Sequence, residues 1–195
     1  MAYYFTLPWL LLSLSLLCIS GKSDAAAAAT SFIRTKCRTT TYPSLCIQSL
    51  SIYANTIQTN PKQLAQTALS VSLDRAQSTR AFVTKLTKFR GLKSRENAAI
   101  RDCMEVMNDG VDRLSKSVQE LKNMGRARGP ELIWHLSNVQ TWVSAALTDY
   151  NTCADGFAGR ASNGSIKSSI KLRMSNVAQV TSNALALINQ FAGQY

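Results

Sequence analysis

The sequence predicts an all-α protein, an up-down-up-down four-helix bundle preceded by an N-terminal helical hairpin and held by two disulfides. Strand signals are sparse, four long segments repeat apolar residues at helical spacing, and the connections between these segments are short. Short connections favour antiparallel neighbours, which gives the up-down order. The 195 residues are enough for one domain with its own core.

Residues 1–29 have the pattern of a secretory signal peptide. The apolar run from Phe5 to Ile19 is too short to span a bilayer, which takes about 20 residues. Small residues follow it, so we expect cleavage among Ala25–Ala29 and a secreted, extracellular domain of residues 30–195 with no membrane contact. The alternative is an uncleaved anchor, which would also face the domain outward.

Two short helices, Thr30–Thr40 and Ser44–Gln58, form the predicted hairpin of residues 30–60. The turn between them contains Tyr42-Pro43-Ser44, where the Ser44 hydroxyl can cap the second helix. Asn60-Pro61 then breaks the chain and places proline at the start of the next helix, a position that proline favours.

Residues 61–195 form the predicted bundle, with helices at Pro61–Phe89, Ser94–Asn123, Pro130–Cys153 and Ser165–Phe191. The second of these helices has the clearest pattern, because its apolar residues alternate steps of four and three. They are Ile100, Met104, Met107, Val111, Leu114, Val118 and Leu121. The third helix repeats this seam with Leu132, Leu136, Val139, Val143, Ala146 and Tyr150, and the fourth with Ile166, Ile170, Val177, Thr181, Ala184, Ile188 and Phe191.

Four cysteines remain after removal of the signal, and an even number in an exported chain indicates disulfides. Three pairings are possible. Cys37 and Cys46 flank the hairpin turn, so a local bridge would clamp it. Cys103 lies near the start of one long helix and Cys153 at the end of the next. Antiparallel packing brings such ends together, so a bridge between these two is geometrically natural.

No feature of the sequence indicates catalysis. His135 is the only histidine, and the chain has no nucleophile elbow, phosphate-binding glycine loop or metal-ligand cluster. Without a Cys-x-x-Cys pair, neither zinc nor another metal is expected, and no cofactor is expected. The formal charge of +11 suits a polyanionic partner, and export argues against nucleic acid. Acidic polysaccharides remain, as does the simpler alternative that lysines and arginines only solvate helix faces.

An acidic stripe distinguishes the helix predicted at Ser94–Asn123. This helix holds six of the ten acidic residues that follow the signal segment. Four of them, Asp102, Glu105, Asp109 and Asp112, step by three, four and three, which places them on the face opposite the apolar seam. The stripe is either a solvated face or a recognition surface for a basic partner. Asn163-Gly164-Ser165 is an acceptor motif for N-glycosylation in a predicted loop.

Three segments together resemble the plant invertase and pectin methylesterase inhibitor family. They are Cys37-Arg-Thr-Thr-Thr-Tyr-Pro-Ser-Leu-Cys46, Ala98-Ala-Ile-Arg-Asp-Cys103-Met-Glu105, and Val139-Gln-Thr-Trp-Val-Ser-Ala-Ala-Leu-Thr148 continuing to Thr152-Cys153-Ala-Asp155-Gly156-Phe157. The resemblance covers essentially the whole predicted mature chain. It implies the same bundle and hairpin, and disulfides Cys37–Cys46 and Cys103–Cys153.

The resemblance also implies a non-catalytic protein that inhibits its target enzyme in a one-to-one complex. In the methylesterase branch, the acidic residues after the third cysteine and the Thr-Cys-x-Asp segment resemble the enzyme-contacting surface. Carried over by motif, the target-binding residues are Glu105, Asp109, Asp112, Thr152 and Asp155. The implied mechanism is occlusion of the pectin-binding cleft, which blocks access of the polymer to the catalytic aspartates of the enzyme.

Pectin methylesterase is the preferred target, and two alternatives remain. Invertase inhibitors typically carry a Pro-Lys-Phe motif between the second and third bundle helices, and the stretch Leu121-Lys-Asn-Met-Gly-Arg-Ala-Arg-Gly-Pro130 lacks it. The first alternative is nevertheless an inhibitor of cell-wall or vacuolar invertase. The second is a non-inhibitory basic wall protein that binds acidic pectin directly, and weak pectin association is also compatible with inhibition.

Overall fold

The computed structural model describes residues 24–89, 91–157 and 164–195, and its regular elements there are all helical. The four long helices are α4 (Pro61–Leu86), α5 (Ser94–Asn123), α6 (Gly129–Gly156) and α7 (Ser165–Ala192). Before them come a helix over residues 24–37, α2 (Pro43–Leu50), a short 3-10 turn (Ser51–Tyr53) and α3 (Ala54–Ile57). Among these residues, no helix is both long and apolar enough to cross a membrane.

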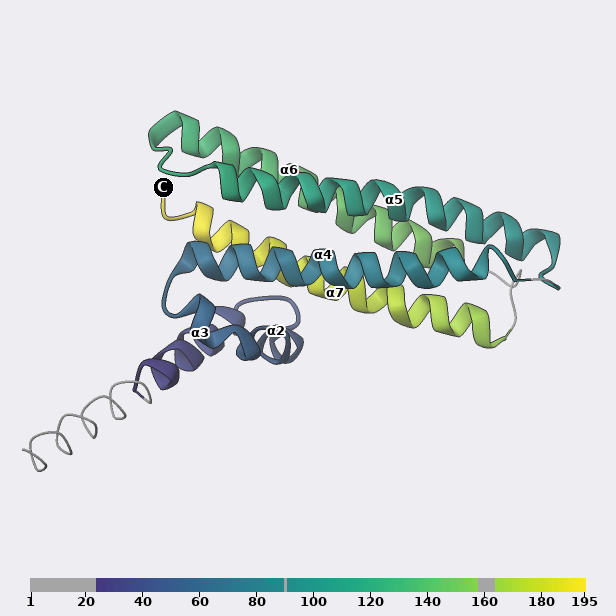
Figure 1. The fold of residues 1–195 in the computed structure, drawn as a ribbon, viewed down its shortest axis with the longest axis horizontal. Helices are drawn as coiled ribbons and strands as arrows, with labels where there is room; N and C mark the ends of the chain where they lie inside the picture. The colour runs from purple at the N-terminus through teal and green to yellow at the C-terminus, as the bar shows by residue number, and fades with distance from the viewer. Residues whose placement is uncertain (1–23, 90, 158–163) are drawn as a thin grey trace, which may run out of the picture.

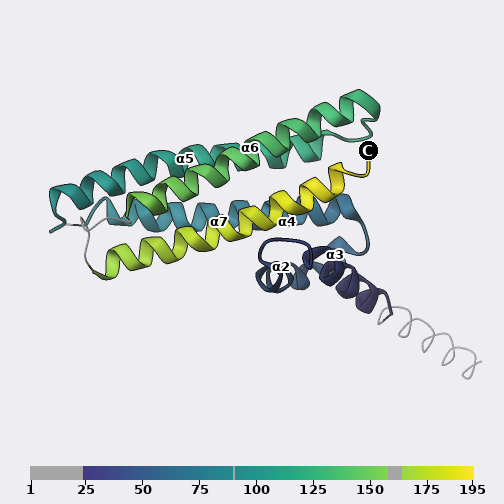
Figure 2. The same cartoon turned by 180° about the vertical axis from the view of Figure 1, so that it is seen from behind.

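The long helices form the predicted up-down-up-down bundle. Each one packs on its two neighbours in a closed ring, α4 on α5, α5 on α6, α6 on α7 and α7 on α4. Two layers result, with α5 and α6 on one side and α4 and α7 on the other (Figures 1 and 2). The hairpin lies against the α4/α7 layer, at the end of the bundle where the chain terminates.

The bundle core is built from the predicted seams, with small corrections. All six seam residues of α6 are buried, as are five of the seven on α5. The other two, Met104 and Val118, are only half-buried and pack against the core from its margin. The α4/α7 interface also holds a polar pair that the sequence did not indicate. The hydroxyls of Ser72 and Thr181 lie 2.7 Å apart inside the core, so each satisfies the other.

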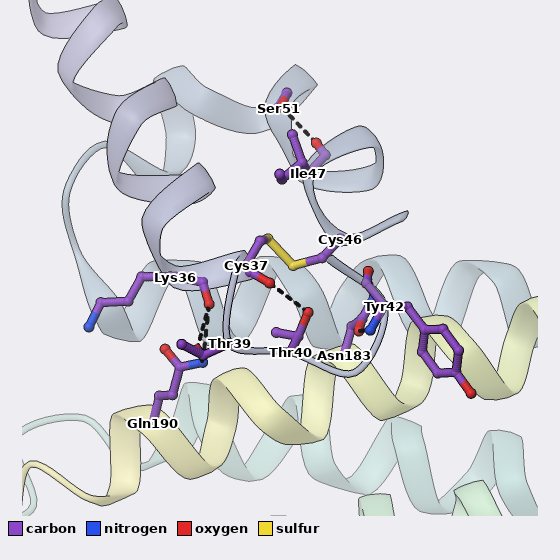
Figure 3. The surroundings of a disulfide bond; sticks show 10 residues. All are labelled: Lys36, Cys37, Thr39, Thr40, Tyr42, Cys46, Ile47, Ser51, Asn183 and Gln190. Atoms are coloured by element: carbon purple, nitrogen blue, oxygen red, sulfur yellow. Dashed lines mark hydrogen bonds between the residues drawn. A yellow bond between two sulfur atoms is a disulfide. The ribbon is translucent and has the colours of Figure 1, made fainter. Parts of the chain in front are cut away.

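The hairpin is clamped by Cys37–Cys46, whose Cα atoms lie 5.6 Å apart, and is docked onto α7 by two side-chain amides (Figure 3). Asn183 accepts from the backbone N–H of Tyr42 (3.0 Å) and donates to its carbonyl (2.9 Å). Gln190 donates to the Lys36 carbonyl (3.2 Å) and to the Thr39 hydroxyl (2.9 Å). These contacts fix the turn, while apolar packing fixes the helices of the hairpin.

The boundaries of the hairpin differ from the prediction. The first helix ends at residue 37 rather than at Thr40, and α2 begins at Pro43, so Ser44 lies inside α2 and does not cap it. The first helix already includes residue 24, because the alanines before Thr30 are strong helix formers. The single helix expected over Ser44–Gln58 is broken after Leu50. There the Ser51 hydroxyl donates to the Ile47 carbonyl (2.6 Å), and a 3-10 turn over Ser51–Tyr53 precedes α3. The break rotates the chain, so that Ile57 is fully buried.

Two boundaries of the long helices also differ. Helix α4 ends at Leu86 rather than Phe89, and α6 extends to Gly156 rather than stopping at Cys153. The extra turn of α6 matters for the site, because it places the residues after Cys153 on the helix instead of in a loop.

Gly110, in the middle of α5, is required by the buried ring of Tyr150 on α6. A Cβ atom at this position would lie 2.5 Å from Cε1 and 2.8 Å from Cζ of that ring. Tyr150 is fully buried, and its hydroxyl has no hydrogen-bond partner among the described residues. Burial raises the pKa of this phenol, so Tyr150 stays neutral and acts as core.

We expect Gly110→Ala to destabilise the domain by about 1–2 kcal/mol. Overpacking costs about 1–3 kcal/mol, and the better helix propensity of alanine offsets about 0.5–1 kcal/mol of that. Gly156→Ala is the matched control, because nothing lies within 4 Å of its added Cβ. Urea unfolding of both variants checks this, and equal stability of the two would contradict the packing described here.

Candidate interaction surface

The disulfide Cys103–Cys153 joins α5 to α6 and positions the side chains around it. The two Cα atoms lie 4.6 Å apart, and both cysteines are buried. On the outer side of this bridge is an open hollow of about 380 Å³, in which Asp102 and Val106 of α5 face Thr152 and Gly156 of α6. The bridge therefore brings two segments 50 residues apart in the sequence onto one surface.

The acidic stripe of α5 is exposed along its whole length. Asp102, Glu105, Asp109 and Asp112 are all exposed, as the spacing predicts. At 1.5 Å per residue, the stripe extends about 15 Å along the helix. Thr152 and Asp155 of α6 are exposed as well, and Thr152 lines the same hollow as Asp102 at one end of the stripe. We call these six residues, Asp102, Glu105, Asp109, Asp112, Thr152 and Asp155, the acidic surface.

The residues of the acidic surface are not equivalent. Arg113 bonds to Asp149 of α6, and a second nitrogen of its guanidinium lies 3.9 Å from Asp109. Asp109 is therefore partly neutralised by its own chain, which the stripe pattern could not indicate. Burial raises the pKa of Asp149, although the Arg113 hydrogen bond and charge oppose that shift. Glu105 and Asp112 have no ion-pair partner among the described residues, so their charges are fully available to a partner.

The hydroxyl of Thr152 already makes one hydrogen bond within its own helix. Its hydroxyl donates to the Thr148 carbonyl at 2.9 Å, so the oxygen remains available only as an acceptor. Asp102 borders the same hollow and was found by spacing, but it was not among the residues that the family motif indicated. The structure adds it as a neighbour of Thr152.

His135 holds α5 and α6 together and takes no part in the acidic surface. Its Nδ1 atom shares a hydrogen bond with Glu120 (2.8 Å), and Asn138 donates to the same carboxylate oxygen (3.2 Å). The His135 bond is the main reason why the pKa of Glu120 lies below its ordinary value.

The described residues contain no cluster of three or more histidine, cysteine or carboxylate side chains that could hold a metal ion. Asn163, the predicted glycosylation site, lies outside the described residues. The acidic surface consists of exposed carboxylates and one hydroxyl. The two helices that carry them are joined by the Cys103–Cys153 disulfide and by the bond between Arg113 and Asp149, which we call the arginine clamp. Such a surface can bind a basic partner by charge and hydrogen bonding.

The fold and this surface define a class of protein, a disulfide-linked helical bundle that binds another macromolecule. Comparisons identify the family. Residues 31–187 match the family described as "Plant invertase/pectin methylesterase inhibitor". The chain belongs to this family, which is one of inhibitors and not of enzymes.

Two relatives and one solved structure illustrate the similarity. The chain is 50% identical to "Pectinesterase inhibitor 11" of Arabidopsis thaliana, over 98% of both chains. It is 54% identical to a "21 kDa protein" of Daucus carota, over 88% of this chain and 89% of that one. The crystal structure of mutant form A of a pectin methylesterase inhibitor from Arabidopsis has a TM-score of 0.63 at 23% identity, over 78% of this chain and 92% of that one. At this identity the structural match supports the fold alone.

Proposed function

We propose that this protein is a secreted inhibitor of pectin methylesterase that forms a one-to-one complex with the enzyme. The observation that carries this proposal is an exposed acidic surface, fixed by a disulfide and an arginine clamp, on a member of an inhibitor family. Relatives that share about half of its residues along the chain are named as pectinesterase inhibitors. Inhibition by this surface needs no chemistry, only a stable complex that covers the substrate path.

The proposed contact residues are the acidic surface. Glu105 and Asp112 carry most of the available charge, Asp109 shares its charge with Arg113, and Thr152 offers an acceptor. Asp102 and Asp155 extend the surface around the disulfide. In the complex these carboxylates would pair with basic groups that line the pectin-binding cleft, where uronate carboxylates otherwise bind. The bundle would then occlude the cleft.

Pectin methylesterase is favoured over invertase as the target. The name of the relative "Pectinesterase inhibitor 11" supports this choice, as does the lack of a Pro-Lys-Phe motif in residues 121–130. The test titrates the purified, oxidised domain against a plant pectin methylesterase and an acid invertase at mildly acidic pH. Saturable inhibition of the methylesterase alone supports the proposal, whereas inhibition of invertase alone would overturn the choice of target.

The proposed site of action is the cell wall, reached through the secretory pathway. Residues 1–29 would act as the signal, with cleavage among Ala25–Ala29. Two disulfides suit an oxidising compartment, and Asn163 would be available for glycosylation there. The positive net charge favours weak association with acidic pectin in addition to enzyme binding.

A further inference from the structure

Charge is divided between the two layers of the bundle. Of the eleven acidic residues in the sequence, six lie on α5 and three on α6. Helix α7 carries Lys167, Lys171 and Arg173 and no acidic residue, and α4 carries four basic residues against the single acid Asp74. The layer opposite the acidic surface is therefore strongly cationic.

The hairpin covers only one half of the α4/α7 layer. Its apolar residues Ile33, Leu50 and Ile57 form a buried cluster with α4 residues up to Val71 and α7 residues from Val180 onward. Beyond these positions the outer faces of α4 and α7 run on without the hairpin (Figures 1 and 2). At the hairpin edge, a hollow of about 430 Å³ lies between Ile52 and the side chains of Asp74, Arg75 and Asn176.

The uncovered half combines cationic and aromatic side chains. The Arg173 guanidinium of α7 lies 4.3 Å from the ring centre of Phe82 on α4. Lys85 is three residues after Phe82 and lies near this ring on the helix surface. Arg75, seven residues before Phe82, lies on the same face of the helix about 10 Å away along its axis. Phe89, just past the end of α4, is 58% exposed. We call Arg75, Phe82, Lys85, Phe89 and Arg173 the open α4/α7 face.

The cations of the open α4/α7 face have no anionic partner among the residues that the structure describes. Arg75, Lys85 and Arg173 are exposed, and none of them pairs with a carboxylate among the described residues. Two guanidinium groups can each bind a carboxylate through two parallel hydrogen bonds. The exposed ring of Phe89 offers a flat apolar surface of the kind on which a sugar ring packs, whereas the half-buried ring of Phe82 packs on the core and lies under the Arg173 guanidinium.

We propose that the open α4/α7 face binds a polyuronate chain, that is, a de-esterified acidic polysaccharide. This proposal deepens the proposed function, on which the choice of a uronate polymer rests. A polymer with a carboxylate on every sugar ring can pair with these cations and pack a ring on Phe89, which a polyanion without rings cannot do. Because this face lies opposite the acidic surface, one molecule can bind the enzyme with α5/α6 and the polymer with α4/α7. The inhibitor would thus be held on the wall material where the enzyme acts.

The test measures binding of the full oxidised domain to immobilised polygalacturonate. The variant Arg75→Gln/Lys85→Gln/Arg173→Gln removes three charges from the open α4/α7 face. Its matched control, Arg101→Gln/Lys116→Gln/Lys122→Gln, removes the same charge from exposed positions on α5. We expect the first variant to bind polygalacturonate roughly tenfold more weakly and the control to stay within about twofold of the parent. We also expect Phe89→Ala to weaken binding, and polyglutamate to bind less well than polygalacturonate.

Three results would overturn the proposal. They are no binding of the parent protein to polygalacturonate, an equal loss in both triple variants, and equal binding of polyglutamate together with no effect of Phe89→Ala. The last two would indicate attraction to any polyanion through net charge alone. Methylesterase inhibition is measured on the same samples and is expected to be unchanged in the open-face variant. A failure of polymer binding with intact inhibition would therefore leave the proposed function standing.

Discussion

Reversing the charge of Glu105 and Asp112 together should weaken inhibition of pectin methylesterase at least about a hundredfold. Both carboxylates are exposed and lack an ion-pair partner among the described residues, so lysine at these positions disturbs no internal contact. In a complex with basic enzyme groups, each reversal replaces an attraction by a repulsion of several kcal/mol. A loss of 1.4 kcal/mol is already a factor of ten in affinity. Inhibition constants of Glu105→Lys/Asp112→Lys and the parent check this.

The matched control is Asp74→Lys, which reverses an exposed acid on α4 in the opposite layer. We expect it to leave inhibition within about twofold of the parent. Because the proposed contacts are ionic, added salt should weaken the parent complex and have less effect on any residual binding of the double variant. If the double reversal inhibits like the parent, the acidic surface is not the enzyme-binding surface, whatever the target.

Removing the Cys103–Cys153 bridge should cost about 4 kcal/mol of stability, because it closes a loop of 50 residues in the unfolded chain. For a domain of this size, that corresponds to a fall in Tm of about 8–16 °C. The change is Cys103→Ala/Cys153→Ala, measured by thermal unfolding. Inhibition should also fall at temperatures where the variant remains folded, since the bridge holds Thr152 beside Asp102.

The hairpin bridge provides the comparison. Cys37→Ala/Cys46→Ala opens a separation of only nine residues and should cost about 3 kcal/mol. Its effect on inhibition should be small, because the hairpin packs on the α4/α7 layer. If both cysteine variants remain folded and lose inhibition equally, the loss would follow from reduced stability alone and not from the position of the Cys103–Cys153 bridge.

Much of the fold could be predicted because each helix carries its own signal. The four-three spacing on α5 and α6 identified the buried residues, and chain geometry made both disulfides natural. The break after Leu50 could not be predicted, because it depends on where Ile57 must pack against the bundle. Helix α4 buries Ser72 against Thr181. This contact could not be predicted either, because buried polar residues do not add to the apolar periodicity that identifies a core face.

The acidic surface could be predicted only in outline. Spacing placed four carboxylates on one face of α5, and the family resemblance added Thr152 and Asp155. The clamp between Arg113 and Asp149 was missed, since it joins residues on different helices. The same holds for Gly110 and Tyr150, where the only sequence signal is a glycine inside a long helix. Contacts between helices depend on their relative rotation, which periodicity alone does not fix.

The most direct test of the account is the kinetic mode of inhibition. If the bundle occludes the pectin-binding cleft, the complex and the substrate exclude each other. Initial rates of a plant pectin methylesterase, measured at several inhibitor and pectin concentrations, should then show an apparent KM that rises with inhibitor at constant kcat. Calorimetric titration of the same pair should give one inhibitor per enzyme. A fall in kcat at unchanged KM would mean that the inhibitor binds away from the cleft, and the occlusion mechanism would be wrong.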